Sequence, residues 1–97
     1  MLAEELPKNA VKVGDTKDAS DRKYTVEFEI AGGKTAKVAA GESKVFELQD
    51  VTKEFHWYNV AGNERIRERV ANDANFNWVK ISRAGNGAIE WTFYRAK

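Results

Sequence analysis

The sequence has no cysteine, one histidine, one proline and one methionine among its 97 residues. The lack of cysteine excludes a disulfide scaffold, a thiolate nucleophile and a cysteine zinc site. The first ten residues, MLAEELPKNA, lack the basic and apolar regions of a signal peptide, so a cytoplasmic location is the expectation. No stretch approaches 18 consecutive apolar residues, and no membrane span is predicted.

The chain also lacks an excess of one charge. Its 16 Lys and Arg and 15 Asp and Glu give a formal net charge of +1. Residues 1–50 hold 8 basic and 10 acidic residues, a net of −2, whereas residues 51–97 hold 8 and 5, a net of +3. The overall charge therefore gives no reason to expect nucleic acid or an anionic membrane as a partner, although the second half is basic.

Catalytic motifs are missing as well. His56 is the only imidazole, and a metal site would need further His or Cys ligands at fixed spacing. There is no G-x-S-x-G, no glycine-rich phosphate loop, no H-E-x-x-H and no EF-hand pattern. The carboxylate pairs Glu27/Glu29 and Glu64/Glu68 are typical of solvated strand faces. We expect no enzyme activity, no cofactor and no metal.

What the sequence does contain is a β pattern with eleven aromatic residues. RKYTVEFEI (22–30) alternates, with Tyr24, Val26, Phe28 and Ile30 on one face. Further strands are predicted at 35–40, 44–48, 54–60, 76–83 and 88–95, separated by turns rich in Gly and Asn. The prediction is one domain, 1–97, with a mainly antiparallel β fold, a sandwich or flattened barrel that ends in a β-meander.

Two segments are harder to assign. Residues 1–21 are predicted to be partly irregular, with a short edge strand at 8–13 and a turn at 14–21; residues 22–97 form the β core. Residues 63–71 fit either a short helix capped by Asn63 or a strand, and their β surroundings favour a strand. The strand aims Glu68 inward, where Lys80 is its predicted partner, whereas the helix would expose Glu68.

The turns predict a register. A loop at 84–87 sets Trp78 opposite Phe93 and Lys80 opposite Trp91. A loop at 71–75 then sets Val70 opposite Phe76, and a loop at 61–64 sets Phe55 opposite Val70. The predicted core face therefore holds Phe55, Trp57, Ile66, Val70, Phe76, Trp78, Ile89, Trp91 and Phe93.

The opposite face is the candidate binding face, and its predicted members are His56, Tyr58, Arg65, Arg67, Arg69, Val79, Ile81 and Tyr94. Arg beside Tyr suits carboxylates, phosphates or stacked bases. The plainer alternative is an outer strand whose Arg side chains pair with Glu64, Asp73 and Glu90. The predicted function is a non-catalytic binding domain for a protein partner or for another copy of itself. A single-stranded nucleic-acid module or a carbohydrate module is the alternative, the latter weakened because all three Trp are assigned inward.

Overall fold

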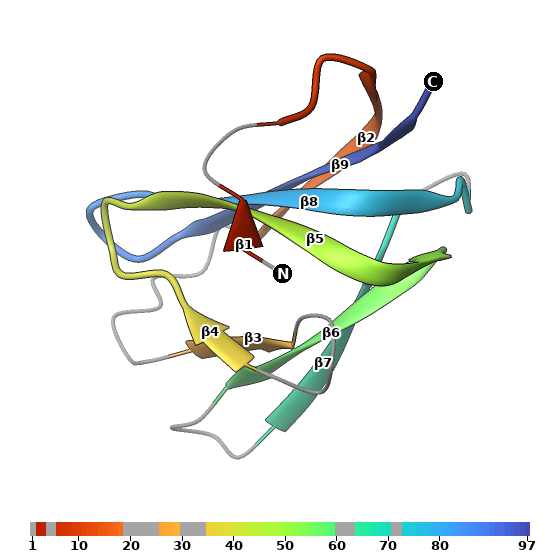
Figure 1. Ribbon diagram of the computed structural model, residues 1–97. Helices are drawn as coiled ribbons and strands as arrows, with labels where there is room; N and C mark the ends of the chain where they lie inside the picture. Colours follow the sequence, from red (N-terminus) through yellow and green to blue (C-terminus); the bar gives the residue numbers. More distant parts are fainter. Residues whose placement is uncertain (1, 4–5, 19–25, 30–34, 60–63, 71–72) are drawn as a thin grey trace.

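In the computed structural model the described residues form nine antiparallel strands in two packed sheets (Figure 1). The structure describes residues 2–3, 6–18, 26–29, 35–59, 64–70 and 73–97. For residues 2–3, 17–18, 26–29, 35–36, 49, 58–59 and 64–66 it describes the backbone alone. The five-stranded sheet has the order β1 (Leu2–Ala3), β5 (Ser43–Thr52), β8 (Phe76–Arg83), β9 (Ile89–Ala96), β2 (Ala10–Asp18). The four-stranded sheet has the order β4 (Thr35–Lys37), β3 (Val26–Glu29), β6 (Glu54–Asn59), β7 (Glu64–Arg69).

This architecture confirms the predicted mainly β fold of sandwich or flattened-barrel type. No helix occurs among the described residues, so none there is long and apolar enough to cross a membrane. Residues 64–69 form a strand rather than the alternative helix, and every one of them pairs with β6, from Glu54 opposite Arg69 to Asn59 opposite Glu64. The alternative helix over residues 63–71 would be too short to compete with that ladder.

The N-terminal strand β2 is longer than the sequence predicted. It is an edge strand, as expected, but it extends through residues 14–18, where a turn was predicted, and that prediction is wrong. Pairing with β9 supplies the backbone hydrogen bonds that local turn chemistry would otherwise satisfy. The register shifts between Lys12 and Gly14, and a Cβ at Gly14 would overlap Val70 Cγ1, so glycine permits a close approach there.

Although β1 and β2 follow one another in the chain, they lie at opposite edges of the five-stranded sheet. The chain between them therefore crosses β5, β8 and β9. In Figure 1 its described part lies above this sheet, on the side away from the four-stranded sheet. Leu6 and Pro7 in this crossing are half-buried. The crossing gives the five-stranded sheet a partly covered outer face.

The predicted register of the last hairpin is wrong by one residue. Trp78 lies opposite Tyr94, Val79 opposite Phe93 and Ile81 opposite Trp91. Five residues, 84–88, separate the paired residues Arg83 and Ile89, whereas a four-residue loop was predicted. Because neighbouring residues of a strand point to opposite faces, the shift puts Val79 and Ile81 in the core cluster and leaves Trp78 out of it, whereas Phe76 at the start of β8 remains in the core. Trp78 is buried, with 8% of its surface exposed, but it is not a member of the core cluster between the sheets.

The core lies between the two sheets and is rich in aromatic rings. Phe55 and Trp57 of β6 meet rings of the other sheet: the centroids of Trp57 and Trp91 are 5.5 Å apart, and those of Phe55 and Phe93 are 5.9 Å apart. The predicted core residues confirmed as buried members of this cluster are Phe55, Trp57, Val70, Phe76, Ile89, Trp91 and Phe93; Ile66 lies outside the described side chains. Leu48 packs against the cluster, and Phe46 belongs to it.

The four C-terminal strands pair as two hairpins, one in each sheet. Residues 64–70 and 76–83 therefore do not form the predicted pair, and Val70 does not oppose Phe76. Val70 is nevertheless buried, since it lies where the chain leaves one sheet for the other. The predicted inward face of Tyr24, Val26, Phe28 and Ile30 lies outside the described side chains.

Candidate functional site

Five members of the predicted binding face occupy neighbouring positions on β6 and β7. The register sets His56 opposite Arg67 and Tyr58 opposite Arg65. These two pairs alternate with the pairs of Trp57 and Ile66 and of Phe55 and Glu68, in which Phe55 and Trp57 are buried in the core. His56 is half-buried, whereas Arg67 and Arg69 are exposed. We call this set, His56, Tyr58, Arg65, Arg67 and Arg69, the basic face; for Tyr58 and Arg65 the structure describes the backbone position alone.

Three other predicted members belong elsewhere. Val79 and Ile81 are 1% and 0% exposed and lie in the core, so their assignment to the binding face is wrong. Tyr94 is half-buried at the register position of Trp78 and Lys12, on the outer face of the five-stranded sheet. The cause is the one-residue shift of the last hairpin, together with the separation of β7 and β8 into different sheets.

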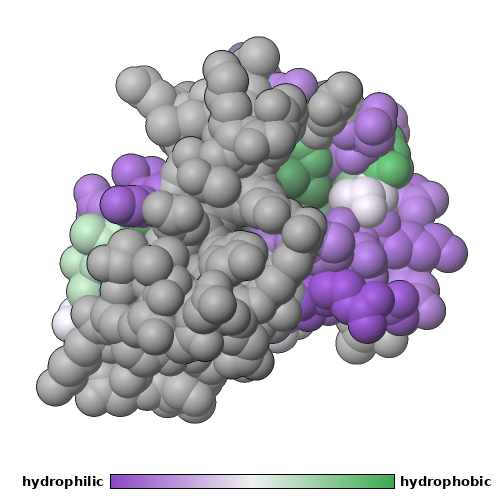
Figure 2. Space-filling model, turned by 90° about the horizontal axis from the view of Figure 1, so that it is seen from below, coloured by the Kyte–Doolittle hydropathy of each residue, from purple (hydrophilic) through white to green (hydrophobic). Residues whose placement is uncertain are grey.

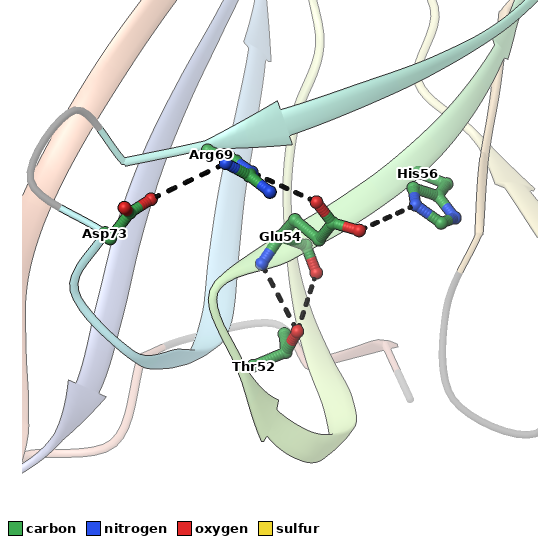
Figure 3. Close-up of polar contacts among 5 residues, drawn as sticks. All are labelled: Thr52, Glu54, His56, Arg69 and Asp73. Atoms are coloured by element: carbon green, nitrogen blue, oxygen red, sulfur yellow. Dashed lines mark hydrogen bonds and ion pairs between the residues drawn. The ribbon is translucent and has the colours of Figure 1, made fainter.

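A polar cluster stands at the end of the basic face where β5 meets β6 (Figure 3). Arg69 Nε donates to Glu54 Oε2 at 3.1 Å, and His56 Nε2 lies 3.4 Å from Glu54 Oε1. Arg69 Nη1 is 3.9 Å from Asp73 Oδ1. Thr52 Oγ1 accepts from the Glu54 backbone N–H and donates to its carbonyl, at 3.2 and 2.9 Å, and so fixes the corner. Glu54 therefore holds His56 and Arg69 in place.

Sequence reasoning missed Glu54 as the carboxylate of this cluster. The available signal was its position two residues before His56, which puts both on one face of a strand. Of the three predicted carboxylate partners for the Arg row, Asp73 is confirmed by its contact with Arg69. The predicted pairing with Glu90 is wrong, because Glu90 lies opposite Ser82 in the other sheet. The side chain of Glu64 lies outside the described side chains.

Glu68 is the inward carboxylate that the strand assignment required. It lies opposite Phe55, and its Oε1 accepts a 3.1 Å hydrogen bond from Trp57 Nε1. The predicted ion pair between Glu68 and Lys80 is wrong. Lys80 is exposed and lies between Thr92 and Val45 in the five-stranded sheet. An indole N–H thus takes the place of the expected ammonium group.

The electrostatics of the cluster favour the ionised form of Glu54. The hydrogen bond from Arg69 is the main cause that holds the pKa of Glu54 below its usual value. The hydrogen bond from His56 and the charges of Arg67 and Arg69 act in the same direction, and desolvation opposes them. Glu54 therefore adds a carboxylate that stays charged at neutral pH to one end of the basic face.

Replacing Arg69 with alanine should raise the pKa of Glu54 toward its usual value, because the variant removes the largest cause of the shift. A pKa lowered in the folded state adds stability above the usual value of 4.5, and this contribution is lost as the pH falls through the lowered pKa. Carboxyl NMR titration measures the change. Arg95→Ala, at an exposed position of β9, is the control. An unchanged Glu54 pKa in Arg69→Ala would contradict the assignment.

Arg67 differs from Arg69 in its surroundings. It is exposed, and no residue of the described part of the chain forms an ion pair or a side-chain hydrogen bond with it. The register sets Glu27 of β3 beside Tyr58, which lies beside Arg65, and all three Arg residues of the basic face belong to β7. The basic residues are thus gathered on β7, at the edge of the sheet.

The view from below shows hydrophilic surface on the right of the molecule, at the end where β5 meets β6 (Figure 2). Within the described ranges no three His, Cys, Asp or Glu side chains come together as a metal site would need. The arrangement suits the binding of an anionic group rather than of a cation. No family model, no curated protein and no solved structure matches this chain.

Proposed function

We propose that this chain is a non-catalytic binding domain whose basic face binds an acidic surface of a protein partner. The observation that carries this proposal is Arg67, which is exposed beside His56 and has no ion-pair partner among the residues described. Guanidinium groups bind carboxylates through two parallel hydrogen bonds. An exposed row of them on one strand attracts acidic partners and steers their approach.

The burial of Val79 and Ile81 favours a charged partner over an apolar one. Because these two side chains lie in the core, they do not supply the aliphatic contact area that the sequence predicted for the binding face. The Trp residues weigh against a carbohydrate ligand, since Trp57, Trp78 and Trp91 are 1%, 8% and 0% exposed and leave no open ring for stacking. Like charges also weigh against pairing of two basic faces.

Arg67→Ala should weaken the binding of poly-L-glutamate by about 5- to 150-fold, which corresponds to roughly 1–3 kcal/mol for a central interface residue. Stability should change by less than about 0.5 kcal/mol, because an exposed Arg without a partner removes no core contact. Fluorescence titration at low salt measures the affinity, and urea unfolding measures the stability. Lys80→Ala is the matched control, an exposed cation on the other sheet.

Three outcomes would count against the proposal. The first is an equal loss of affinity in both variants, which would mean binding to net charge alone. The second is binding of single-stranded oligonucleotides, with a steep loss on raising the salt, and no binding of polyglutamate; this would favour the nucleic-acid alternative. The third is concentration-dependent sedimentation that Arg67→Ala abolishes, which would favour self-association.

A further inference from the structure

Strand β7 is the edge of the four-stranded sheet. Among the described strands it pairs with β6 alone, so one side of its backbone forms no strand ladder there. Among the described residues strand β2 meets one end of β7, where Thr16 Oγ1 donates to the Arg69 carbonyl at 3.4 Å and Val70 packs against Gly14. Figure 1 shows β7 at the outside of the lower sheet. An edge strand of this kind is a template for the addition of another strand.

The Arg row decides which strands can be added. In the antiparallel pairing of β7 with β7 of a second copy that sets Arg67 opposite Arg67, every Arg of the row opposes an Arg of the other copy, and in the registers shifted by two residues two of the three still do. The first of these registers also sets Arg65 opposite Arg69. Like charges directly opposite each other destabilise a strand pair. The row therefore disfavours self-pairing at this edge and favours a strand with carboxylates at alternate positions.

We propose that an extended acidic segment of the partner adds to β7 as a fifth strand of this sheet, with carboxylates at every second residue facing the Arg row. This rests on the function proposed above and names the form of the partner. Alternate residues of a strand are about 6.8 Å apart, so carboxylates at positions i, i+2 and i+4 match the spacing of Arg65, Arg67 and Arg69. Backbone hydrogen bonds supply affinity and the alternating side chains supply specificity.

The three Arg residues are not equivalent in this arrangement. Arg69 is already bonded to Glu54, and the contact from Thr16 lies at its carbonyl. The partner strand is therefore expected to pair with the Glu64–Arg67 part of β7 and to place carboxylates at the positions of Arg65 and Arg67. Arg67 should then contribute more to the affinity than Arg69 does.

The test compares two peptides of one composition: an alternating (Glu-Val)4 and a block peptide with four Glu followed by four Val. The alternating peptide should bind at least about tenfold more tightly, because only it can present carboxylates on one face of a strand. N-methylation of every second amide, on the side that faces β7, should abolish that advantage. Binding should also slow hydrogen exchange of the β7 amides that do not bond to β6. Affinities are measured by fluorescence anisotropy on the full chain.

Each outcome decides between the two proposals. If both peptides bind equally and both lose affinity in Arg67→Ala, the basic face binds acidic chains but strand addition is wrong. If the alternating peptide binds better and Arg67→Ala does not affect it, the Arg row is not the specificity element and the inference is overturned. If neither peptide nor polyglutamate binds, both proposals fail. Lys80→Ala should leave the preference for the alternating peptide unchanged.

Discussion

Replacing Trp91 with alanine is expected to lower the free energy of unfolding by about 3–5 kcal/mol. Trp91 is 0% exposed, its ring centroid lies 5.5 Å from that of Trp57 in the other sheet, and it belongs to the single core cluster of buried residues. Truncation leaves a cavity between the two sheets, and the surrounding strands can close it only in part. Urea unfolding followed by far-UV circular dichroism measures the loss.

Trp91→Phe is the matched control. Its cost should stay below about 2 kcal/mol, because a smaller ring still fills most of the space. In addition, no described residue accepts a hydrogen bond from the buried Trp91 Nε1, so phenylalanine leaves no acceptor unsatisfied. Trp57→Phe should cost more than Trp91→Phe, since it removes the donor to the Glu68 carboxylate. A Trp91→Ala variant as stable as the parent chain would contradict the placement of this face in the core.

Arg83→Ala is the second large effect, expected at about 2–4 kcal/mol. Arg83 is 6% exposed, the one charged residue classed as buried in the described part of the chain. Its Nη1 donates to the Val38 carbonyl at 2.9 Å, and its Nε and Nη2 donate to the Gly87 carbonyl at 3.3 and 3.1 Å. The side chain thus joins the residues after β4 to the β8–β9 loop. Its removal leaves the Val38 and Gly87 carbonyls without these donors.

Arg83→Lys separates the charge from the geometry. An ammonium group cannot reproduce the planar fork that reaches both carbonyls, so this variant should still lose about 1–2 kcal/mol. Arg95→Ala, at an exposed position, should change the stability by less than about 0.5 kcal/mol. Urea unfolding of the three variants gives the comparison. If Arg83→Ala and Arg95→Ala were equally stable, the bridging role of Arg83 would be wrong.

The sequence predicted the strands well because local pattern governs them. The pairing of Phe55 with Glu68 and of Trp57 with Ile66 leaves His56 opposite Arg67, so the outer positions of this hairpin follow from simple alternation. The three Arg at every second residue then identify the basic face without knowledge of the fold. The predicted pair of Phe55 and Val70 differs from the observed pair of Phe55 and Glu68 by two residues, and a shift of two preserves the faces.

The segment 76–83 shows why pattern alone failed elsewhere. Its large apolar residues fall on both parities, Phe76 and Trp78 on one and Val79 and Ile81 on the other, so alternation does not choose a face. The choice depends on the length of the turn, and one residue more in the loop at 84–88 exchanges the faces. Gly87, with a φ of 93°, and the hydrogen bond from Gly87 N to Ala84 O are part of that turn.

The sequence by itself thus determined most of the strand positions beyond residue 35, most of the core aromatic residues and the Arg row, because each depends on neighbours a few residues apart. Tertiary structure alone decided that β7 and β8 belong to different sheets, that Val79 and Ile81 are buried, and that β7 is an edge. The part that Glu54 plays in the site was likewise visible only in the tertiary structure, because its hydrogen bond with Arg69 forms between two paired strands. Pairing between distant segments depends on which surfaces bury the most apolar area together, and that sum over the whole chain is not contained in any local pattern.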